Sequence, residues 1–493
     1  MAPLVSTDPV TGAELARFDI ADPEVVAAAV TAARAAGQWW DQLGFRHRRA
    51  RLLAWRSLLT RRLTELAELV SAETGKPRAE AVVEVAAAIG DLDWAARHAR
   101  RVLRPRRVRR VLPVAEAAAH LAYRPYGVVG VIGPWNYPVL TPMSSIGYAL
   151  AAGNAVVHKP SELTPAVGQW LADSFAEVVP EQPVFSVVHG PGEVGAALCR
   201  SGVDKVSFTG STATARQVMA ACAERLVPVV LEAGGKDAML VAADADLAAA
   251  AEACVWGAFT NAGQTCVGIE RVYVAAEVYP QFLDEVVARA RRLVVGGPDR
   301  DLGPVLVPAQ VEVIRAQIAD ALARGATAVL GGVDAVEPPY VRPTVLVDVP
   351  PDATVLRQET FGPVLVVTPV SDMDEAVRLA NDSRYGLGGA VWGRRRAAVA
   401  LARRLRVGMV AVNDALSFAG MSSLPWGGVG DSGIGRLRGD HGLREFAQPV
   451  SLVVRQVRSP LPSRTFDRTD RDVRRIVAFY RFRYGRRPGR RGG

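Results

Sequence analysis

The sequence predicts an α/β fold built on mostly parallel sheets, from two patterns and from the length of the chain. From residue 128 onward, short β-branched runs bounded by Gly or Pro alternate with helix-like segments of about 10–18 residues. Before them, residues 23–101 are rich in Ala and Arg, and stretches such as Arg48–Val70 repeat apolar residues at the helical spacing. At 493 residues the chain is too long for one core, so we expect two or three units.

Five strands are expected in the first alternating region, and this alternation implies a sheet covered on both faces by helices. They are Val128–Ile132, Ala155–Val157, Phe185–Val188, Lys205–Phe208 and Pro228–Leu231. Ligands of such sheets bind beside the carboxyl ends of the strands. Segments 133–136, 159–162 and 210–211 fall at those ends, so we expect a binding site there.

A second alternating region follows the first directly. We expect strands at Met239–Val241 and Val272–Val274, with one long helix over Asp246–Gly263 between them. Two further strand-like segments, Leu121–Tyr126 and Ser451–Val457, lie outside both alternations. The chain is therefore expected to hold two α/β regions and a small additional β element.

The composition indicates a folded globular protein of a reducing compartment. Hydrophobic residues make up 49% and charged residues 22% of the chain, and no apolar run reaches the roughly 18 residues of a membrane span. The first ten residues lack a signal-peptide pattern, so a cytoplasmic location is expected. The four cysteines contain no Cys-x-x-Cys pair and the six histidines form no ligand-spaced cluster. This argues against a metal site and a disulfide framework.

The formal charge of +9 is concentrated in the C-terminal tail. Residues 459–493 hold eleven arginines against three aspartates, which leaves the body of the chain near +1. A near-neutral body argues against nucleic acid as a partner. In the tail, Asp470 is expected to cap an amphipathic helix. Its apolar stripe comprises Val473, Ile476, Val477 and Tyr480. We expect this helix to pack on the body and to precede a disordered end, with contact to an anionic membrane or nucleic acid as the less favoured alternative.

The segment Asn261-Ala-Gly-Gln-Thr-Cys266 holds the strongest candidate for a nucleophile. Cys266 follows a break at Gly263 and a polar stretch, which predicts an exposed turn. The alternative is a small buried apolar residue, the commonest state of a free cysteine. That alternative is favoured for the three cysteines in apolar helical patterns, Cys199, Cys222 and Cys254.

Two polar residues at strand ends could assist a nucleophile. Glu232 follows the run Pro228–Leu231 just ahead of two glycines. A carboxylate facing a crevice there can act as a general base, and the alternative is a solvated turn acid. Asn136 lies between Pro134 and Pro138 and offers a fixed amide donor to an oxyanion. Its alternative is an ordinary turn Asn.

Three segments carry nucleotide-binding signals. In Lys159-Pro-Ser-Glu162, the lysine and the carboxylate can hold ribose hydroxyls, and the carboxylate disfavours a 2′-phosphate. Gly210 and Ser211 begin a helix, where phosphate binds favourably. The match to G-x-G-x-x-G over Gly190–Gly195 is weak by itself.

In this order and at these separations, the motifs closely resemble those of the aldehyde dehydrogenase superfamily over residues 7–457. Asn136 and Lys159 are 23 residues apart, and Glu232 and Cys266 are 34 residues apart. Further matches are residues 359–363, Asn381 with 385–387, and 425–428 with 432–433.

The resemblance implies covalent oxidation of an aldehyde to the carboxylic acid. Cys266 would attack the aldehyde carbon as a thiolate, which calls for a pKa below the free value of about 8.5. The amide of Asn136 and the backbone N–H of Cys266 would hold the oxyanion, and Glu232 would activate the water that hydrolyses the thioester. One alternative is an acylating enzyme that passes the thioester to coenzyme A, against which Glu232 argues. Another is a catalytically silent scaffold of the same fold.

The resemblance also implies an NAD(P) cofactor, with NAD preferred because of Glu162 and NADP left open. Lys159 and Glu162 match contacts to the adenine ribose. Ser211 matches a pyrophosphate contact, and Glu359 matches a contact to the nicotinamide ribose. The full set of implied cofactor contacts is Ile132, Pro134, Trp135, Lys159, Ser161, Glu162, Gly192, Phe208, Gly210, Ser211, Glu359 and Phe361.

The fold that the resemblance implies is α/β and has three parts. They are a Rossmann-like cofactor-binding domain (residues 1–106 and 126–234), an α/β catalytic domain (235–440) and a small β oligomerisation arm (107–125 and 441–458). The basic tail, 459–493, belongs to none of them. Self-association as a dimer or tetramer follows by analogy, and no metal is implied.

The implied substrate pocket contains Tyr137, Leu140, Ser144, Thr260, Thr265 and Val267. Succinic semialdehyde enzymes carry arginines at the positions of Ser144 and Thr260, and this chain has neither. Betaine aldehyde enzymes often carry an aromatic residue at the Ser144 position, which is absent as well. An apolar or aromatic aldehyde is therefore the expected substrate.

Overall fold

The computed structural model describes residues 3–109, 117–457 and 465–485. The chain divides into two compact units, in line with the two or three units expected from its length. The larger unit comprises Met1–Val102 and Pro125–Ala447, and the smaller comprises Leu103–Arg124 and Gln448–Gly493.

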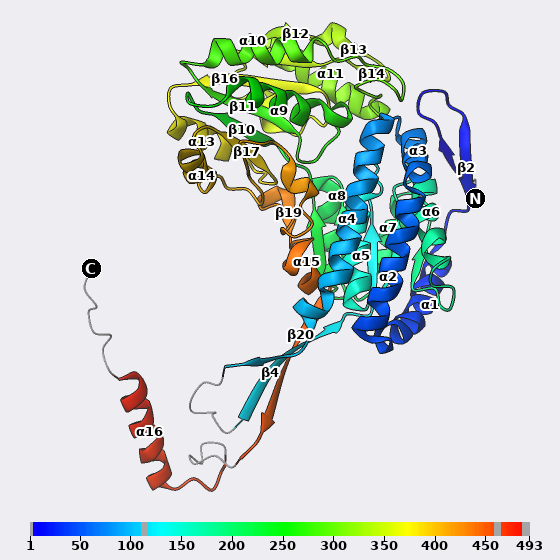
Figure 1. Ribbon diagram of the computed structural model, residues 1–493, viewed down its shortest axis with the longest axis vertical. Coiled ribbons are helices and arrows are strands. Elements are labelled where there is room, and N and C mark those ends of the chain that lie inside the picture. The colour runs from blue at the N-terminus through cyan, green and yellow to red at the C-terminus, as the bar shows by residue number, and fades with distance from the viewer. Residues whose placement is uncertain (1–2, 110–116, 458–464, 486–493) are drawn as a thin grey trace. The chain divides into compact units, whose positions relative to one another are not determined.

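Four helices open the larger unit, in blue in Figure 1, where the periodicity of residues 23–101 predicts helices. They are α1 (Pro23–Gln42), α2 (Gly44–Arg61), α3 (Leu63–Thr74) and α4 (Arg78–Leu103), and they follow a hairpin of β1 (Leu4–Thr7) and β2 (Glu14–Phe18). Helix α1 begins at Pro23 because Oδ1 of Asp22 accepts a hydrogen bond from the N–H of Val25 at 2.8 Å. Helix α3 ends at Gly75, which adopts a left-handed φ of 69°.

A six-stranded sheet contains the first alternating region, in the order β19-β9-β8-β5-β6-β7. Its parallel strands are β5 (Val128–Ile132), β6 (Ala155–Lys159), β7 (Phe185–Val187), β8 (Lys205–Thr209) and β9 (Val229–Glu232), and β19 (Gly433–Ile434) is antiparallel to β9. The connecting helices are α5 (Leu140–Ala152), α6 (Pro165–Ala176), α7 (Gly192–Arg200) and α8 (Thr212–Ala223). All five expected strands are present. Every residue of β5 and β6 is buried, because helices cover both faces of the sheet.

A seven-stranded sheet contains the second alternating region, in the order β12-β15-β16-β11-β10-β17-β18. Its strands are β10 (Asp237–Val241), β11 (Ile269–Ala275), β12 (Thr327–Leu330), β15 (Thr344–Val347), β16 (Val364–Val370), β17 (Gly389–Trp392) and β18 (Ala411–Val412), of which β12 is antiparallel. The accompanying helices are α9 (Leu247–Phe259), α10 (Tyr279–Ala290), α11 (Pro308–Ala323), α12 (Thr354–Arg357), α13 (Met373–Asn381) and α14 (Arg395–Ala402). Helix α15 (Gly439–Glu445) packs instead against α5 of the six-stranded sheet. A short hairpin of β13 (Val336–Glu337) and β14 (Tyr340–Val341) completes the region. The two expected strands lie inside β10 and β11.

The expected helix over Asp246–Gly263 is shorter than predicted. Helix α9 ends at Phe259 because Asn261 and Ala262 adopt left-handed φ values of 53° and 54°. Side-chain patterns do not report backbone angles of this kind, since both residues also occur in helices.

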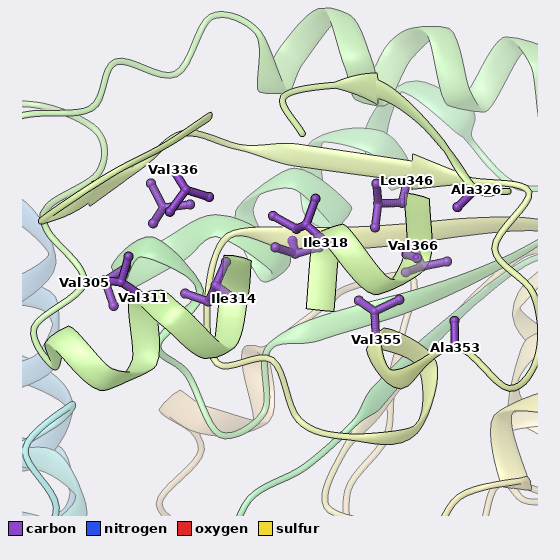
Figure 2. Packing of buried hydrophobic residues seen from close by; sticks show 13 residues of the cluster. Val305, Val311, Ile314, Ile318, Ala326, Val336, Leu346, Ala353, Val355 and Val366 are labelled. Atoms are coloured by element: carbon purple, nitrogen blue, oxygen red, sulfur yellow. The ribbon is translucent and has the colours of Figure 1, made fainter. Parts of the chain in front are cut away.

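A hydrophobic cluster packs α11 against the seven-stranded sheet (Figure 2). Ile314 and Ile318 of α11 are fully buried in it, together with Leu346 of β15 and Val366 of β16. The packing is tight enough that a Cβ on Gly362 would lie 2.2 Å from Cδ1 of Ile314. The loop before β16 is therefore fixed against this core.

The smaller unit contains a three-stranded sheet in the order β20-β4-β3. The strands are β3 (Arg106–Val108), β4 (Ala117–Pro125) and β20 (Ala447–Arg455). The two strand-like segments that lay outside both alternations correspond to β4 and β20. Strand β20 is an edge strand, and its side chains are mostly exposed.

Among residues 465–485, the described part of the tail, the structure has the helix α16 (Asp470–Tyr484). The prediction that Asp470 caps it is wrong. Thr469 is the cap, because its hydroxyl accepts the N–H of Asp472 at 3.3 Å and Oδ2 of Asp472 accepts the N–H of Thr469 at 3.1 Å. No residue of α16 is buried. That this helix packs on the body stays a prediction.

Within the described ranges, no helix combines the length and the hydrophobicity needed to cross a bilayer. In the same ranges, no group of three or more His, Cys, Asp and Glu side chains is arranged to hold a metal ion. All four cysteines are free thiols.

Candidate active site

Cys266 follows a left-handed turn between α9 and β11. The φ values of Asn261, Ala262 and Gly263 are 53°, 54° and 74°. Such backbone costs about 1–3 kcal/mol at each non-glycine residue. The buried carboxylate of Glu80 offsets part of this cost by accepting the N–H of Asn261 at 2.8 Å. Position 263 requires glycine, because a Cβ there would lie 2.2 Å from neighbouring backbone.

This turn is buried, contrary to the exposed turn that its polar residues predict. Thr265 and Val267 are buried, and Cys266 is only partly exposed. The polar side chains find partners inside the protein. Nε2 of Gln264, for example, donates to the carbonyl oxygens of Asn261 at 3.0 Å and of Pro304 at 3.1 Å.

The thiol of Cys266 donates a hydrogen bond to Glu232, with Sγ 3.3 Å from Oε1. Glu232 is the last residue of β9, and its backbone is held from both sides. Its carbonyl accepts the N–H of Gly210 at 3.1 Å, and it pairs with Gly433 of β19. The acid at the end of one sheet and the cysteine ahead of a strand of the other sheet therefore meet in one site.

Both groups of this pair hold their protons more tightly than usual. Burial raises the pKa of Glu232, although the hydrogen bond from the Cys266 thiol opposes the rise. Burial also raises the pKa of the Cys266 thiol well above its ordinary value, and the carboxylates of Glu232 and Glu359 raise it further. The depressed thiol pKa expected above is therefore wrong for this arrangement, because the sulfur faces a carboxylate and not a cation.

Asn136 lies in the loop between β5 and α5 and is fixed beside the nucleophile. Its carbonyl oxygen accepts from Nζ of Lys76 at 2.8 Å and from Nδ2 of Asn261 at 3.1 Å. Its own Nδ2 donates to the carbonyl of Gln264 at 3.0 Å. An amide nitrogen carries two N–H groups, so the second can donate to an oxyanion formed at Cys266.

A cleft of about 780 Å³ follows the carboxyl ends of β5, β6 and β8 and reaches Cys266. We call it the strand-end cleft. All twelve residues predicted as cofactor contacts line it, and so does Asn136. The structure thus brings together segments that are up to about 230 residues apart in the sequence, as parallel sheets of this kind do.

Charged and helix-terminal groups lie along the strand-end cleft. Nζ of Lys159 is 2.9 Å from Oε2 of Glu162. Ser211 caps α8 by accepting the N–H of Thr214 at 3.2 Å, so the amino end of this helix borders the cleft. Gly192 opens α7, where an added Cβ would have nothing within 4 Å. Close packing therefore does not require glycine at position 192, the second glycine of the G-x-G-x-x-G match.

Glu359 lies at the part of the cleft nearest to the nucleophile. Its Oε1 accepts the N–H of Gly235 at 3.0 Å. The Glu359 carboxylate packs closely on Gly234, since a Cβ at that position would lie 2.1 Å from it and would displace it. Burial raises the pKa of Glu359 to about 8, and the charge of Glu270 adds to the shift. The ring of Phe361 packs edge-on against Trp135, with centroids 5.5 Å apart.

A second cavity, of about 480 Å³, meets the strand-end cleft at Cys266. Among the described residues, Cys266 is the one that lines both cavities. Residues of α4 and α9 border the second cavity, and we call it the α4–α9 pocket. All six residues predicted for the substrate pocket line it. Glu232 also faces this pocket and not the strand-end cleft.

Charged residues beside the site were missed in the sequence because they carry no motif. They are Lys76, Glu80, Glu84, Asp91 and Arg438. Lys76 pairs with Glu84, and Nε of Arg438 lies 2.8 Å from Oδ2 of Asp91. Glu84 and Asp91 could have been identified from the sequence, because they are seven residues apart on the apolar face of α4. Acids at such positions are costly unless paired.

The chain resembles known proteins over nearly its whole length. A sequence profile of the aldehyde dehydrogenase family matches residues 2–452. A 4,4'-diapolycopene aldehyde oxidase from a Methylomonas species is 39% identical over 489 residues, which covers 98% of this chain and 92% of that protein. The structure of an NAD-dependent aldehyde dehydrogenase from Sinorhizobium meliloti matches with a TM-score of 0.89 at 32% identity, covering 94% of this chain and 93% of that one. An NADP-dependent glyceraldehyde-3-phosphate dehydrogenase from Bacillus halodurans, complexed with NADP, matches with a TM-score of 0.88 at 31% identity, covering 92% and 96%.

Removing the carboxylate of Glu232 is expected to make the Cys266 thiol more acidic. The negative charge of Glu232 and its hydrogen bond both raise the thiol pKa, so in Glu232→Gln the thiolate should form at lower pH. The rate of alkylation by iodoacetamide, measured against pH, reports this change as a midpoint shifted to lower pH. Cys266→Ala is the control and should abolish the fast phase, because the other three cysteines are buried. An unchanged or higher midpoint in Glu232→Gln would contradict the electrostatic account.

Proposed function

Because the chain belongs to the aldehyde dehydrogenase family and is an NAD(P)-dependent oxidoreductase, we propose that it oxidises an aldehyde to the carboxylic acid through a thioester on Cys266. The observation that carries this proposal is the position of the Cys266 thiol. It lies 3.3 Å from Glu232, at the junction of the strand-end cleft and the α4–α9 pocket. The relatives are named for aldehydes as different as 4,4'-diapolycopene aldehyde and glyceraldehyde-3-phosphate. Their names therefore do not identify which aldehyde this protein oxidises.

In the first half of the reaction, Sγ of Cys266 bonds to the aldehyde carbon. The thiol proton passes to Glu232, which already accepts a hydrogen bond from it. The carbonyl oxygen becomes an oxyanion, and it receives hydrogen bonds from the amide of Asn136 and from the backbone N–H of Cys266. Losing one oxyanion donor typically costs about 10²–10³ in rate.

The strand-end cleft suits a nicotinamide dinucleotide by the chemistry of its donor set. Lys159 and Glu162 can hold ribose hydroxyls, and the amino end of α8 at Ser211 offers N–H groups to a pyrophosphate. Glu359 can bind a second ribose near Cys266. A cofactor held by these residues would supply the acceptor for the hydride of the thiohemiacetal carbon on Cys266. What remains on Cys266 is the thioester.

Before the second half, Glu232 releases the thiol proton to solvent. The carboxylate then takes a proton from water while the water oxygen bonds to the thioester carbon. The C–S bond then breaks, the carboxylic acid leaves, and the Cys266 sulfur becomes available again. An acylating enzyme would place the thiol of coenzyme A where this water reacts, and it would need no base at Glu232. The buried Glu232 carboxylate therefore favours hydrolysis over transfer to coenzyme A.

Two substitutions separate the halves of this reaction. Cys266→Ala should abolish oxidation, because no other thiol reaches the junction of the cavities. At a pH above the midpoint of the Cys266 thiol, where the thiolate forms without Glu232, Glu232→Gln should form about one NAD(P)H per active site in a rapid burst. It should then turn over about 10²–10⁴-fold more slowly, because the thioester loses its base. Stopped-flow absorbance at 340 nm measures both phases. Full steady-state activity in either variant would rule out the proposed roles.

We infer that residues 1–106 and 126–234 bind the cofactor, that residues 235–440 supply the nucleophile, and that NAD is preferred to NADP. Glu162 supports the preference, because its carboxylate lines the strand-end cleft beside Lys159. A 2′-phosphate on the adenine ribose would bring like charges together at this point.

Neutralising Glu162 tests the cofactor preference. In Glu162→Gln, kcat/KM with NADP should rise about tenfold relative to kcat/KM with NAD, because the repulsion of the 2′-phosphate is lost. Glu193→Gln is the matched control, since this acid also lines the strand-end cleft but on α7. A ratio that moves equally in both variants would point to the net charge of the cleft and not to Glu162.

We also infer that residues 107–125 and 441–458 form an oligomerisation arm and that the protein is a dimer or tetramer. Strand β20 lies at the edge of its sheet. Its Leu452, Val453 and Val454 are 52%, 61% and 46% exposed. An apolar edge strand of this kind favours pairing with another chain, and a second copy of this chain is the partner that the inference requires.

A lysine on β20 should weaken this self-association. Val453→Lys places a charge on the apolar strand and is expected to shift the molar mass in light scattering from the oligomer towards the monomer of 52.5 kDa. Val25→Lys on α1 is the control, because Val25 is 51% exposed and lies outside the proposed arm. The same mass for the wild type and Val453→Lys would remove β20 from the interface.

A further inference from the structure

We infer that the aldehyde is a long, uncharged one whose apolar chain fills the α4–α9 pocket and leaves it between Val83 and Trp256. The inference rests on the proposed function, since it takes the aldehyde carbon to lie at Cys266. The pocket volume of about 480 Å³ is within the ordinary range for small-molecule sites. The chemistry of the pocket wall and of its mouth therefore decides which aldehydes are accepted.

The wall of the pocket is apolar along most of its length. Its aliphatic side chains include Val83, Ala87, Leu140, Val267, Leu416 and Ala419, and the indoles of Trp256 and Trp426 add aromatic surface. An alkyl or polyene chain that replaces water against such a wall gains the hydrophobic term.

Four hydroxyl groups that line the pocket already have hydrogen-bond partners within the protein. The hydroxyls of Tyr137 and Thr265 are 2.9 Å apart, and the hydroxyl of Thr260 donates to Glu80 at 3.0 Å. The hydroxyl of Ser144 donates to Asp91 at 2.6 Å. None of these groups needs a ligand to satisfy it, so the wall does not select for a polar chain.

An anionic chain finds no available cation in the pocket. Among the described residues that line it, Arg438 is the sole cation. The Arg438 guanidinium is committed to Asp91 at 2.8 Å and to the carbonyl of Ala419 at 2.6 Å. Glu80 and Glu84 also line the pocket. Glu84 is paired with Lys76, and Glu80 accepts hydrogen bonds from Thr260 and Asn261, so neither carboxylate is free to bind a charged chain.

A cationic chain is disfavoured for a separate reason. A quaternary ammonium binds on the faces of aromatic rings. Two of the rings here already carry a cation. Nζ of Lys76 lies 3.9 Å from the centroid of Tyr137, and the guanidinium of Arg438 lies 4.6 Å from the Trp426 ring.

The mouth of the pocket extends the apolar wall into solvent. Val83 on α4 is 64% exposed, and Trp256 on α9 is 53% exposed. Exposed apolar side chains at the rim of a cavity are a mark of ligand contact. A chain longer than the pocket would lie against these two residues.

The first test measures kcat/KM for straight-chain aldehydes from propanal to dodecanal. The value should rise about three- to fourfold for each methylene that becomes buried. Over the five methylenes between propanal and octanal, the rise should amount to about 200- to 1,000-fold. Charged aldehydes are compared with neutral ones of equal size, succinic semialdehyde with 4-methylpentanal and betaine aldehyde with 3,3-dimethylbutanal. Each charged member should be at least about 100-fold poorer.

A second readout does not depend on turnover. The affinity of the wild-type protein for uncharged alkyl carboxamides, from propanamide to decanamide, is measured by titration calorimetry and should rise with chain length. Trp256→Ala should weaken decanamide binding about fivefold more than propanamide binding. Leu226→Ala, which removes a side chain 89% exposed and outside the pocket, should change neither.

The outcomes separate the two levels of the proposal. Equal kcat/KM across chain lengths, or a preference for a charged member of either pair, would overturn the inference while leaving Cys266-dependent oxidation intact. If no aldehyde is oxidised, the proposed function fails, and the amide series alone decides whether the pocket binds long apolar chains.

Discussion

The site depends on one contact across two sheets, the hydrogen bond from the Cys266 thiol to Glu232. Glu232 ends β9 of the six-stranded sheet, and β10 of the seven-stranded sheet begins five residues later at Asp237. The segment between them must turn closely enough for the sulfur to reach the carboxylate. Position 235 requires glycine for this reason, because a Cβ there would lie 2.5 Å from the carbonyl oxygen of Cys266. The base can lie beside the nucleophile because the connecting segment has no side chain at position 235.

Buried ion pairs hold the loops around this contact. Lys236 pairs with Glu270, and the Glu270 carboxylate accepts the N–H groups of Thr360 and Phe361, both at 3.1 Å. On the other side, Glu84 pairs with Lys76 and accepts the N–H of Val139 at 2.9 Å. Burying such pairs generally contributes little net stability. Their effect here is geometric, since each carboxylate fixes the backbone of a loop that borders the site.

The sequence predicted the parts of the fold that depend on residue patterns. The parallel strands, the early helices and the segments at the strand ends follow from periodicity and from Gly and Pro. It did not predict the left-handed turn at Asn261 and Ala262, because those angles are imposed by Glu80 and by packing around Gly263. The acidity of Cys266 was predicted with the wrong sign, since the distance to Glu232 is a tertiary property. Arg438 was missed because an arginine reads as a surface residue until its partner Asp91, 347 residues earlier, is known.

The two cavities have Cys266 as their single shared residue among those described, and this makes the two halves of the site separable in evolution. A substitution in the wall of the α4–α9 pocket alters no residue of the strand-end cleft. The residues of the strand-end cleft, which would bind the cofactor, can therefore stay unchanged while substitutions in the pocket change which aldehydes are accepted. Conversely, Gly235 has no such freedom, because a Cβ there would lie 2.5 Å from the carbonyl oxygen of Cys266. Diversification of a protein built in this way should be concentrated along α4, α9 and the segment 416–426.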